Sequence, residues 1–403
     1  MSRQAWLLVL ACLGCTEQYE VFPLAGRDAG VADAAGSAGA DTGGVGGAPS
    51  PTGATLGAMD VNACSLEGGV AWCWGSNADY ALGLSDTTVS APPTAVSGVT
   101  DLVVIGVGLG FACGLGVEGE VWCWGRNASG QLGTGDTTSR PEPQPVLLEA
   151  GATQISVGTE HACAITPGGE LWCWGENGER QLGNPDLDAD QTRPLRVGTW
   201  NDWAEVSAGQ GHTCGIRVGG SLYCWGRNAQ GQLGLGANAP IQLGEPTLVN
   251  DTADWTQVAA DQRITCGIQA PGALYCWGDN TDGQLGVGDL DARLVPERIG
   301  TGSDWRKVAV NALHSCALDG AGTVWCWGRG AEGQLGLGDA EPRLEPTTVE
   351  ATGSFVDLTL GRFFTCVREE QGAVFCTGRN DDGALGIPNV DRVLELTAVE
   401  GLP

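Results

Sequence analysis

The chain has 403 residues, a formal net charge of −28, 66 glycines, 16 cysteines and 15 tryptophans. Length alone would suggest two or three domains, but the regular spacing of these residues indicates one repetitive architecture. The acidity excludes a basic nucleic-acid-binding surface, and it would repel anionic lipid headgroups. No run of about 18 apolar residues occurs, so the sequence predicts no transmembrane helix.

The first 15 residues have the pattern of an export signal. Arg3 is followed by an apolar run over residues 5–14, which is too short to cross a membrane. The end of this run, Leu13-Gly14-Cys15, resembles the lipobox of bacterial lipoproteins. This resemblance implies that Cys15 is lipidated and becomes the new amino terminus.

Two other interpretations of this segment stay open. Cys12 follows Ala11 and is a second candidate for lipidation. Cys12 and Cys15 also form a CxxC pair, which elsewhere indicates redox or metal chemistry, but the export context favours a lipoprotein. Thr16, rather than Asp, follows Cys15. In Gram-negative lipoproteins this resemblance implies the outer membrane or cell surface.

Residues 16–53 are dominated by Ala, Gly and Asp. Such a segment buries too little apolar surface to offset the entropy of ordering it, so we expect a disordered tether. The expected organisation is therefore a signal peptide over 1–15, a tether over 16–53 and a folded body over 54–403.

The folded body consists of seven repeats. The triplet CWG begins at six positions spaced 50 to 52 residues apart, and a seventh copy reads CTG; these copies begin at Cys73, Cys123, Cys173, Cys224, Cys276, Cys326 and Cys376. Short runs rich in Val, Ile, Trp and Tyr alternate with glycine pairs, which favour tight hairpin turns. No window has the apolar period of a helix. The repeats are therefore all-β.

The residues of one predicted strand indicate how the repeats pack. In the strand over 170–174, Leu171 and Cys173 face one side while Trp172 and Trp174 face the other, and both sides are apolar. A sheet that is buried on both faces lies between neighbouring sheets, as in a β-propeller blade. An open solenoid is the alternative, but it would need polar capping repeats, and the end copies keep the motif.

The string CWGxNxxGQLG resembles the repeat of the regulator-of-chromosome-condensation family. Residues 123–133, 224–234 and 276–286 match throughout, whereas the third copy has Arg180 and the sixth has Gly330 at motif positions. The first and last copies read YALG and GALG instead of GQLG, and we expect them to meet where the ring closes. The resemblance covers about 350 residues. It implies a seven-bladed propeller of four-stranded blades.

Fourteen further cysteines occur as two in each repeat, with nine residues between the two, or eight in the first repeat. We expect each pair to lie on adjoining antiparallel strands, where directly opposite residues have the separation that a disulfide needs. Zinc binding is the alternative, but one cysteine pair in each repeat cannot supply four converging ligands. The predicted intra-blade disulfides are Cys64–Cys73, Cys113–Cys123, Cys163–Cys173, Cys214–Cys224, Cys266–Cys276, Cys316–Cys326 and Cys366–Cys376.

The sequence contains no recognisable catalytic constellation. His161, His212 and His314 share one repeat position that elsewhere holds Asn, Phe or Ile, so we interpret it as a packing position, with a polar cluster near the channel as the alternative. Asp186-Leu-Asp-Ala-Asp190 resembles the start of a calcium loop but lacks its glycine and its bidentate glutamate. A solvated acidic loop is favoured there. We expect no catalytic residue, cofactor or metal site.

These observations favour a binding module over an enzyme. A rigid ring would present variable loops to an unidentified protein partner, for which the candidate segments are 134–145, 184–196 and 235–246. Resemblance to a secreted bacterial β-lactamase inhibitor with the same propeller implies that such a surface can inhibit an enzyme. The alternatives are an extracellular lyase or hydrolase, and the nucleotide exchange on a GTPase that the family's eukaryotic founder implies. We expect a monomer that contacts the membrane only through its lipid anchor.

Overall fold

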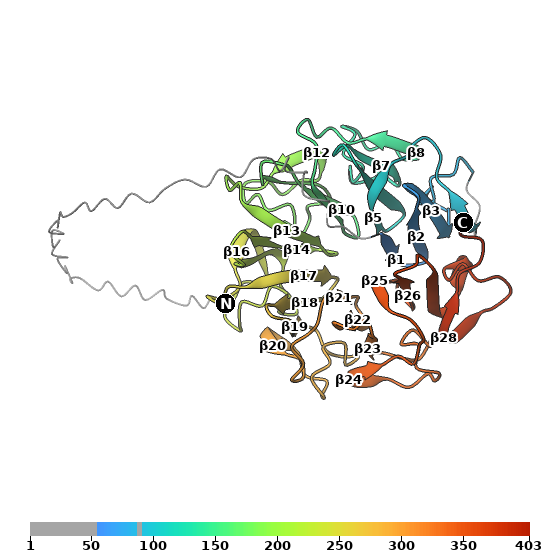
Figure 1. The fold of residues 1–403 in the computed structure, drawn as a ribbon. Coiled ribbons are helices and arrows are strands. Elements are labelled where there is room, and N and C mark those ends of the chain that lie inside the picture. The colour runs from blue at the N-terminus through green and yellow to red at the C-terminus, as the bar shows by residue number, and fades with distance from the viewer. Residues whose placement is uncertain (1–54, 87–90) are drawn as a thin grey trace, which may run out of the picture. The chain divides into compact units, whose positions relative to one another are not determined.

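The computed structural model describes residues 55–86 and 91–403. The candidate lipidation cysteines Cys15 and Cys12, the predicted signal peptide and the whole of the predicted tether lie outside the described residues. Within them the chain folds into seven four-stranded antiparallel sheets that are arranged around a central axis (Figure 1). None of the described residues forms a helix long and apolar enough to cross a membrane.

Each blade consists of four consecutive strands, of which the first lies nearest the axis and the fourth at the periphery. The strands of blades 1 to 4 are β1 (Leu56–Met59), β2 (Asn62–Glu67), β3 (Val70–Gly75) and β4 (Ala91–Ala95); β5 (Leu102–Gly108), β6 (Phe111–Gly116), β7 (Val121–Gly125) and β8 (Arg140–Pro145); β9 (Gln154–Val157), β10 (His161–Ile165), β11 (Leu171–Gly175) and β12 (Gln191–Arg196); β13 (Trp203–Ala208), β14 (His212–Arg217), β15 (Leu222–Arg227) and β16 (Gln242–Leu248). Those of blades 5 to 7 are β17 (Trp255–Asp261), β18 (Ile264–Gln269), β19 (Ala273–Gly278) and β20 (Arg293–Arg298); β21 (Lys307–Val310), β22 (His314–Leu318), β23 (Val324–Gly328) and β24 (Arg343–Thr348); β25 (Phe355–Leu360), β26 (Phe364–Glu369), β27 (Val374–Arg379) and β28 (Arg392–Ala398).

The blades form a closed ring rather than an open solenoid, because β1 lies beside both β5 and β25. No strand is exchanged between the first and last blades. Instead, side chains join them across the seam. Trp74 donates its indole N–H to the carbonyl of Ala384 at 2.9 Å, and the Arg368 guanidinium forms an ion pair with Glu67 at 2.6 Å. The first and last repeats therefore meet at the closure, as expected from their divergent motifs.

The third strand of each blade supplies the core between blades. In β11, Leu171, Cys173 and Trp174 are fully buried, while Trp172 is half-buried near the edge. The indole N–H of Trp174 donates to the carbonyl of Gln131 in the preceding blade at 2.9 Å. Five other tryptophans at this motif position make the equivalent bond with carbonyls in the preceding blade: Trp74, Trp124, Trp225, Trp277 and Trp327. In the seventh blade Thr377 replaces the tryptophan, and its hydroxyl donates to the carbonyl of Gly333 at 3.0 Å.

The two cysteines of every blade face each other on its second and third strands. Cys163 and Cys173, for example, are directly opposite in the β10–β11 register, and their Cα atoms are 4.1 Å apart. All seven predicted pairs are disulfide-bonded in this way. The seven-bladed propeller of four-stranded blades with one disulfide in each blade is confirmed.

In six blades, a buried or half-buried asparagine holds the turn that follows the CWG or CTG triplet. The side-chain oxygen of Asn127 accepts the N–H of Leu132 at 2.9 Å, and its amide donates to the carbonyls of Asp136 and Thr138. Five other blades repeat this arrangement, and only the sixth has glycine there, at Gly330. An arginine recurs next to this position in four blades, as Arg126, Arg227, Arg329 and Arg379, but these arginines do not share one partner. Of these arginines, Arg329 and Arg379 pair within their own turns, while Arg126 and Arg227 pair with neighbouring blades; the asparagine is the common anchor.

The peripheral strands carry prolines that limit pairing with other chains. Proline lies in the fourth strand of six blades and is absent only from β28. Because proline has no N–H to donate, it interrupts the exposed edge of a sheet. This edge chemistry fits the expectation of a monomer.

The first prediction concerns the disulfides. Intact-mass measurement of the full chain after reduction under denaturing conditions should show a gain of two hydrogens for each of the seven disulfides. Replacing both Cys113 and Cys123 by alanine should lower the free energy of unfolding by about 2–3 kcal/mol, because the short loop is no longer closed in the unfolded chain. Fourteen thiols titratable without reduction would contradict the assignment.

Candidate functional site

The topology divides the connections of each blade between two ends of the ring. Because consecutive strands are antiparallel, the turn between the first two strands and the loop between the last two lie at the same end. We name this end the channel-mouth face. The turn between the second and third strands lies at the opposite end, together with the link to the next blade.

Turns at the opposite end join one blade to the next. The carbonyl of Gly169 accepts the N–H of Trp203 at 3.0 Å, and that of Gly220 accepts the N–H of Trp255 at 3.1 Å. A Cβ atom on Gly169 would lie 2.3 Å from the carbonyl oxygen of Asn201. These turns therefore need glycine for close approach of two backbones, and their conformation is set by packing between blades.

The inner turns at the channel-mouth face vary much more. The turn residue four positions before the first cysteine of each blade is acidic, apolar, polar or basic according to the blade. These seven residues together line a cavity of about 360 Å³ on the ring axis: Asp60, Leu109, Thr159, Gln210, Gln262, Ala312 and Arg362. A cavity of this size with mixed polar and apolar walls is typical of a ligand site. No repeat motif predicted it, because only the closed ring brings these seven turns together.

Backbone hydrogen bonds hold several of these turns against one another. The N–H of Leu109 donates to the carbonyl of Thr159 at 2.9 Å, and the N–H of Thr159 donates to the carbonyl of Gly209 at 3.1 Å. Across the seam, the N–H of Arg362 donates to the carbonyl of Asp60 at 3.0 Å. The rim of the mouth is thus a fixed scaffold that carries variable side chains.

The three candidate binding segments are loops only in part. Segments 134–145, 184–196 and 235–246 begin as loops on the channel-mouth face, but their later halves form the peripheral strands β8 and β12 and most of β16. The sequence did not reveal these strands, since a peripheral strand such as Arg140–Pro145 packs on one side only and has no alternating apolar pattern.

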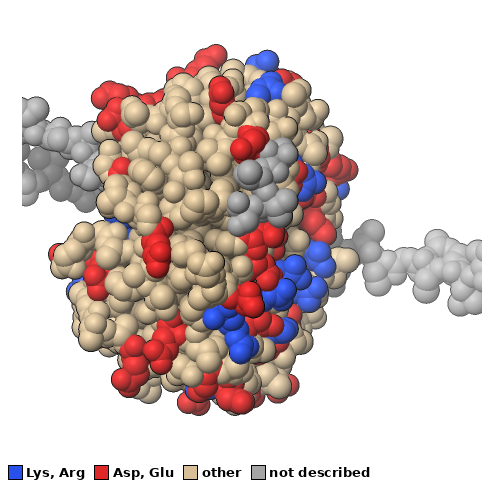
Figure 2. Space-filling model, turned by 90° about the vertical axis from the view of Figure 1, so that its right-hand side faces the viewer, with Lys and Arg blue, Asp and Glu red and all other residues tan. Residues whose placement is uncertain are grey.

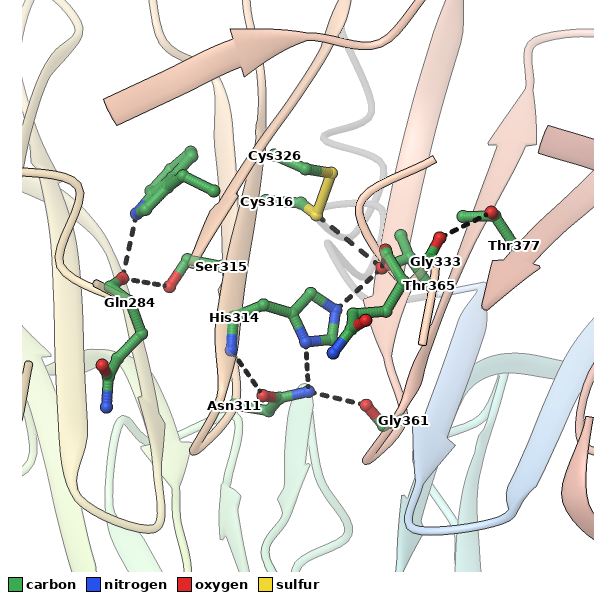
Figure 3. Close-up of a disulfide and its surroundings, with 12 residues drawn as sticks. Gln284, Asn311, His314, Ser315, Cys316, Cys326, Gly333, Gly361, Thr365 and Thr377 are labelled. Carbon is green, nitrogen blue, oxygen red and sulfur yellow. Dashed lines mark hydrogen bonds between the residues drawn. A yellow bond between two sulfur atoms is a disulfide. The ribbon is translucent and has the colours of Figure 1, made fainter. Parts of the chain in front are cut away.

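The three histidines lie in the packed interior. His161, His212 and His314 are fully buried, and each Nε2 atom is within 2.8–2.9 Å of a threonine hydroxyl in the next blade. Figure 3 shows His314 between Thr365 and the side chain of Asn311. Burial lowers the pKa of each imidazole to about 3, so all three are neutral near pH 7. This geometry is that of packing residues that join blades.

Two buried carboxyl groups near the axis were not found by sequence reasoning. Asp261 lines the mouth cavity, where burial raises its pKa to about 7. Glu205 lies deeper on β13, accepts the N–H of Val258 at 3.0 Å and has its pKa raised to about 8 by burial, although Lys307 opposes this shift. Asp261 stands where the other repeats have an uncharged residue, which is the signal that could have revealed it. The position of Glu205 holds Lys307 and Asp357 in the last two blades, so a charge there does not single it out.

Charge is distributed unevenly around the mouth. Near blades 3 and 4, a hollow is lined by three glutamates, Glu160, Glu176 and Glu179. Burial raises the pKa of Glu176, the one of these three without an ion pair to a described residue. Near blades 6 and 7, the cavity is lined instead by Arg329 and Arg362.

The acidic segment Asp186–Asp190 is not arranged as a cation site. Asp188 forms an ion pair with Arg180 at 2.8 Å, and Asp190 accepts the backbone N–H of Asn177 at 2.9 Å. Across residues 55–86 and 91–403, no three His, Cys, Asp or Glu residues are grouped so that they could hold a metal ion.

The second prediction uses the buried histidines. Stability that depends on a neutral imidazole is complete above the unfolded pKa of about 6.5 and is lost as the pH falls toward 3. His161→Phe should fold, since Phe111 and Phe364 occupy the same position. As the pH falls from 6 to 4, the free energy of unfolding should decrease less steeply in the variant than in the parent. The difference between the two slopes should be up to about 1.4 kcal/mol per pH unit. Urea unfolding across this range tests it, and an unchanged pH dependence would contradict a buried neutral His161.

Comparisons with known proteins agree with this architecture. Residues 52–350 match the model of the RCC1-like domain, and residues 355–384 match the regulator of chromosome condensation (RCC1) repeat. The chain is similar to the ultraviolet-B receptor UVR8 of Arabidopsis thaliana, with 35% identity over 95 residues, which is 24% of this chain and 22% of the receptor. It is also 35% identical over 97 residues to the regulator of chromosome condensation of Xenopus laevis, covering 24% of this chain and 23% of that protein. The matched segments thus span less than a quarter of either relative.

Solved structures show the same fold at low identity. Prp20p of Saccharomyces cerevisiae superimposes with a TM-score of 0.75 and 21% identity, covering 84% of this chain and 87% of Prp20p. Human WBSCR16 has a TM-score of 0.75 and 22% identity over 83% of this chain and 94% of its own. Since the family model covers well over half of the chain, and its repeat recurs in the seven blades of the ring, this protein belongs to the RCC1-like domain family.

Proposed function

We propose that this chain is an exported, lipid-anchored protein that binds a partner protein through its channel-mouth face and catalyses no reaction. One observation carries the binding role. Variable inner turns from all seven blades converge on one cavity, whereas turns at the opposite end are used to join blades. Recognition by variable side chains on a rigid scaffold is the usual arrangement of a binding module.

Structural relatives support a protein partner. Prp20p is described by its binding to Gsp1p and histones, and yeast RCC1 (Prp20) has been crystallised with Kap60. The same fold therefore presents surfaces to other proteins. The net charge of −28 argues against a nucleic-acid partner for this chain.

The burial of the three histidines supports a binding protein rather than an enzyme. A general base must reach the substrate, but the imidazoles of His161, His212 and His314 are buried and bonded to threonines. Human HERC5 is named a ligase, but the chain matches only 9% of its length. That likeness supports no ligase activity here. An inhibitor of a secreted enzyme would be one kind of protein-binding module.

The anchor and the location rest on the amino-terminal pattern. The apolar run before Leu13-Gly14-Cys15 supports export and lipidation, and an oxidising compartment suits seven disulfides. A lipid-held body with its mouth accessible would meet partners in the periplasm or at the cell surface.

The third prediction tests the binding face. A photo-crosslinking amino acid at the exposed Gln210, on the inner turn of blade 4, should give a defined adduct with a partner in living cells. The same amino acid at Val218, which is 70% exposed at the opposite end of the same blade, is the matched control and should give none. Adducts from position 218 alone, or from neither position, would contradict the proposal. Turnover of an ester or polysaccharide panel that one point mutation abolishes would overturn the non-enzyme role.

The fourth prediction tests the anchor. Cys15→Ser should abolish incorporation of labelled palmitate and move the protein from the membrane fraction to the soluble fraction, because a stable anchor needs its acyl chains. Cys12→Ser is the control and should keep both properties. Loss of label in the Cys12 variant alone would assign the lipid to that residue, and absence of label from the unaltered chain would exclude the anchor.

A further inference from the structure

Three guanidinium groups surround one phenylalanine ring on the channel-mouth face. The Cζ atoms of Arg362, Arg379 and Arg329 lie 4.9, 5.3 and 6.0 Å from the centroid of Phe363. These distances are in the range of cation–π contacts. Arg362 and Phe363 form the inner turn between β25 and β26, Arg329 directly follows β23, and Arg379 ends β27. We name Arg329, Arg362, Arg379 and Phe363 the arginine cluster.

This convergence of positive charge is unusual for so acidic a chain. The sequence has 48 acidic residues and only 20 basic ones. In addition, Arg392 lies directly opposite Arg379 in the β27–β28 pair, an arrangement in which like charges repel. Figure 2 shows one side of the ring, on which several blue side chains lie together beside acidic ones, while other blue side chains lie apart near the top of the view. Packing alone does not require such a cluster.

One of the three guanidinium groups keeps its hydrogen-bond donors free. Arg329 donates to Glu332 at 2.8 and 3.2 Å, and Arg379 donates to Asp381 at 2.6 Å. The Arg362 side chain is 61% exposed and makes no hydrogen bond with any described residue, and its nearest carboxylate, on Asp60, is 3.9 Å away. Arg362 therefore has donors for an external acceptor.

Apolar side chains line the cavity beside these donors. Arg362 and Phe363 share its wall with Leu313 and Leu360 from the neighbouring turns. Two acidic residues, Asp60 and Asp261, also line this cavity. Burial raises the pKa of Asp261 to about 7, so it is partly neutral near neutral pH and repels an anion less than an ordinary aspartate would. A ligand that fits this wall combines one acidic group with apolar groups next to it.

We propose that the arginine cluster binds a carboxylate group on a partly apolar peptide segment of the partner protein, with Arg362 as the principal donor and Phe363 as the apolar contact. The proposal deepens the proposed function by specifying the partner. A single carboxylate suits the site better than a phosphate, because Glu332 and Asp381 already neutralise two of the three arginines. A dianion would meet their repulsion and that of the −28 chain.

The glutamate-lined side of the mouth, near blades 3 and 4, determines how the bound peptide segment is oriented. Glu160, Glu176 and Glu179 line the hollow near blades 3 and 4. They would repel a second acidic group, so the carboxylate of the ligand lies toward blades 6 and 7. The shared chemistry is a carboxylate, which comes either from an Asp or Glu side chain or from the chain terminus of the partner.

The fifth prediction is a selection experiment with the full chain. A random heptapeptide display library, selected at about 0.15 M salt where exposed long-range attraction is screened, should yield peptides enriched in Asp or Glu next to aliphatic residues. Net charge alone predicts the reverse, an enrichment in Lys and Arg. Arg362→Gln should abolish the acidic enrichment. Arg227→Gln is the matched control, because Arg227 lines the hollow near blades 3 and 4 on the same face, and the variant should retain the enrichment.

Fluorescence anisotropy then identifies the source of the carboxylate. The most enriched peptide should bind about tenfold more tightly than its Asn or Gln counterpart, as expected for one charge-assisted hydrogen-bonded pair. If the carboxylate that binds is the C-terminal carboxylate of the peptide instead, amidation of that terminus should abolish the tighter binding. Thermal unfolding checks that Arg362→Gln and Arg227→Gln fold equally well. Arg362→Lys should retain part of the preference.

Several results would overturn the proposal. These are cationic or purely apolar selected peptides, acidic enrichment that survives Arg362→Gln, or concentration-dependent dimerisation of the chain that Arg362→Gln abolishes while no peptide is selected. None of these results removes the photo-crosslinked partner predicted from position 210. Failure of the carboxylate site is therefore distinguishable from failure of the binding function.

Discussion

Every blade is held to its predecessor by a buried hydrogen bond that crosses the space between two sheets. In six blades the donor is the indole N–H of the CWG tryptophan, as in Trp174 to the carbonyl of Gln131 at 2.9 Å. The indole ring of the tryptophan fills the space between the two sheets. Its N–H donates to a carbonyl that would otherwise be buried without a partner. The buried asparagine in the same turn, such as Asn127, fixes the position of that carbonyl. The strict repeat motif follows from this one contact.

Closure of the propeller ring depends on the same kind of tryptophan hydrogen bond, here between the first and last repeats, whose motifs diverge. Trp74 reaches Ala384 in the last repeat, and Arg368 pairs with Glu67 beside it. Among the described residues no strand is shared across this seam, so side-chain contacts and the backbone hydrogen bond from Arg362 to Asp60 join the two ends. In the last blade the tryptophan is absent, and the shorter Thr377 makes the hydrogen bond to blade 6 instead.

Because strands and opposite-end turns are committed to joining blades, variation is left to the channel-mouth face. There the inner turns differ in charge and size from blade to blade while their backbones are held by bonds such as Leu109 to Thr159. The result is a rigid rim with glutamates on one side and arginines on the other. Such a polar rim can orient a ligand that carries charge at one end.

The sequence by itself determined the blade count, the strand-rich repeats and the cysteine pairing. These features are local and repeated, and a buried two-sided strand such as the one with Leu171 and Trp174 admits few other environments. Only the tertiary structure decided what lies at the mouth. Arg329 and Arg362 are 33 positions apart, and Asp60 is 269 positions from the first and 302 from the second, so no spacing rule relates them. The closed ring brings them to one cavity because its seven inner turns share an axis. The burial of Asp261 and Glu205 likewise depends on neighbouring blades, and so do their raised pKa values.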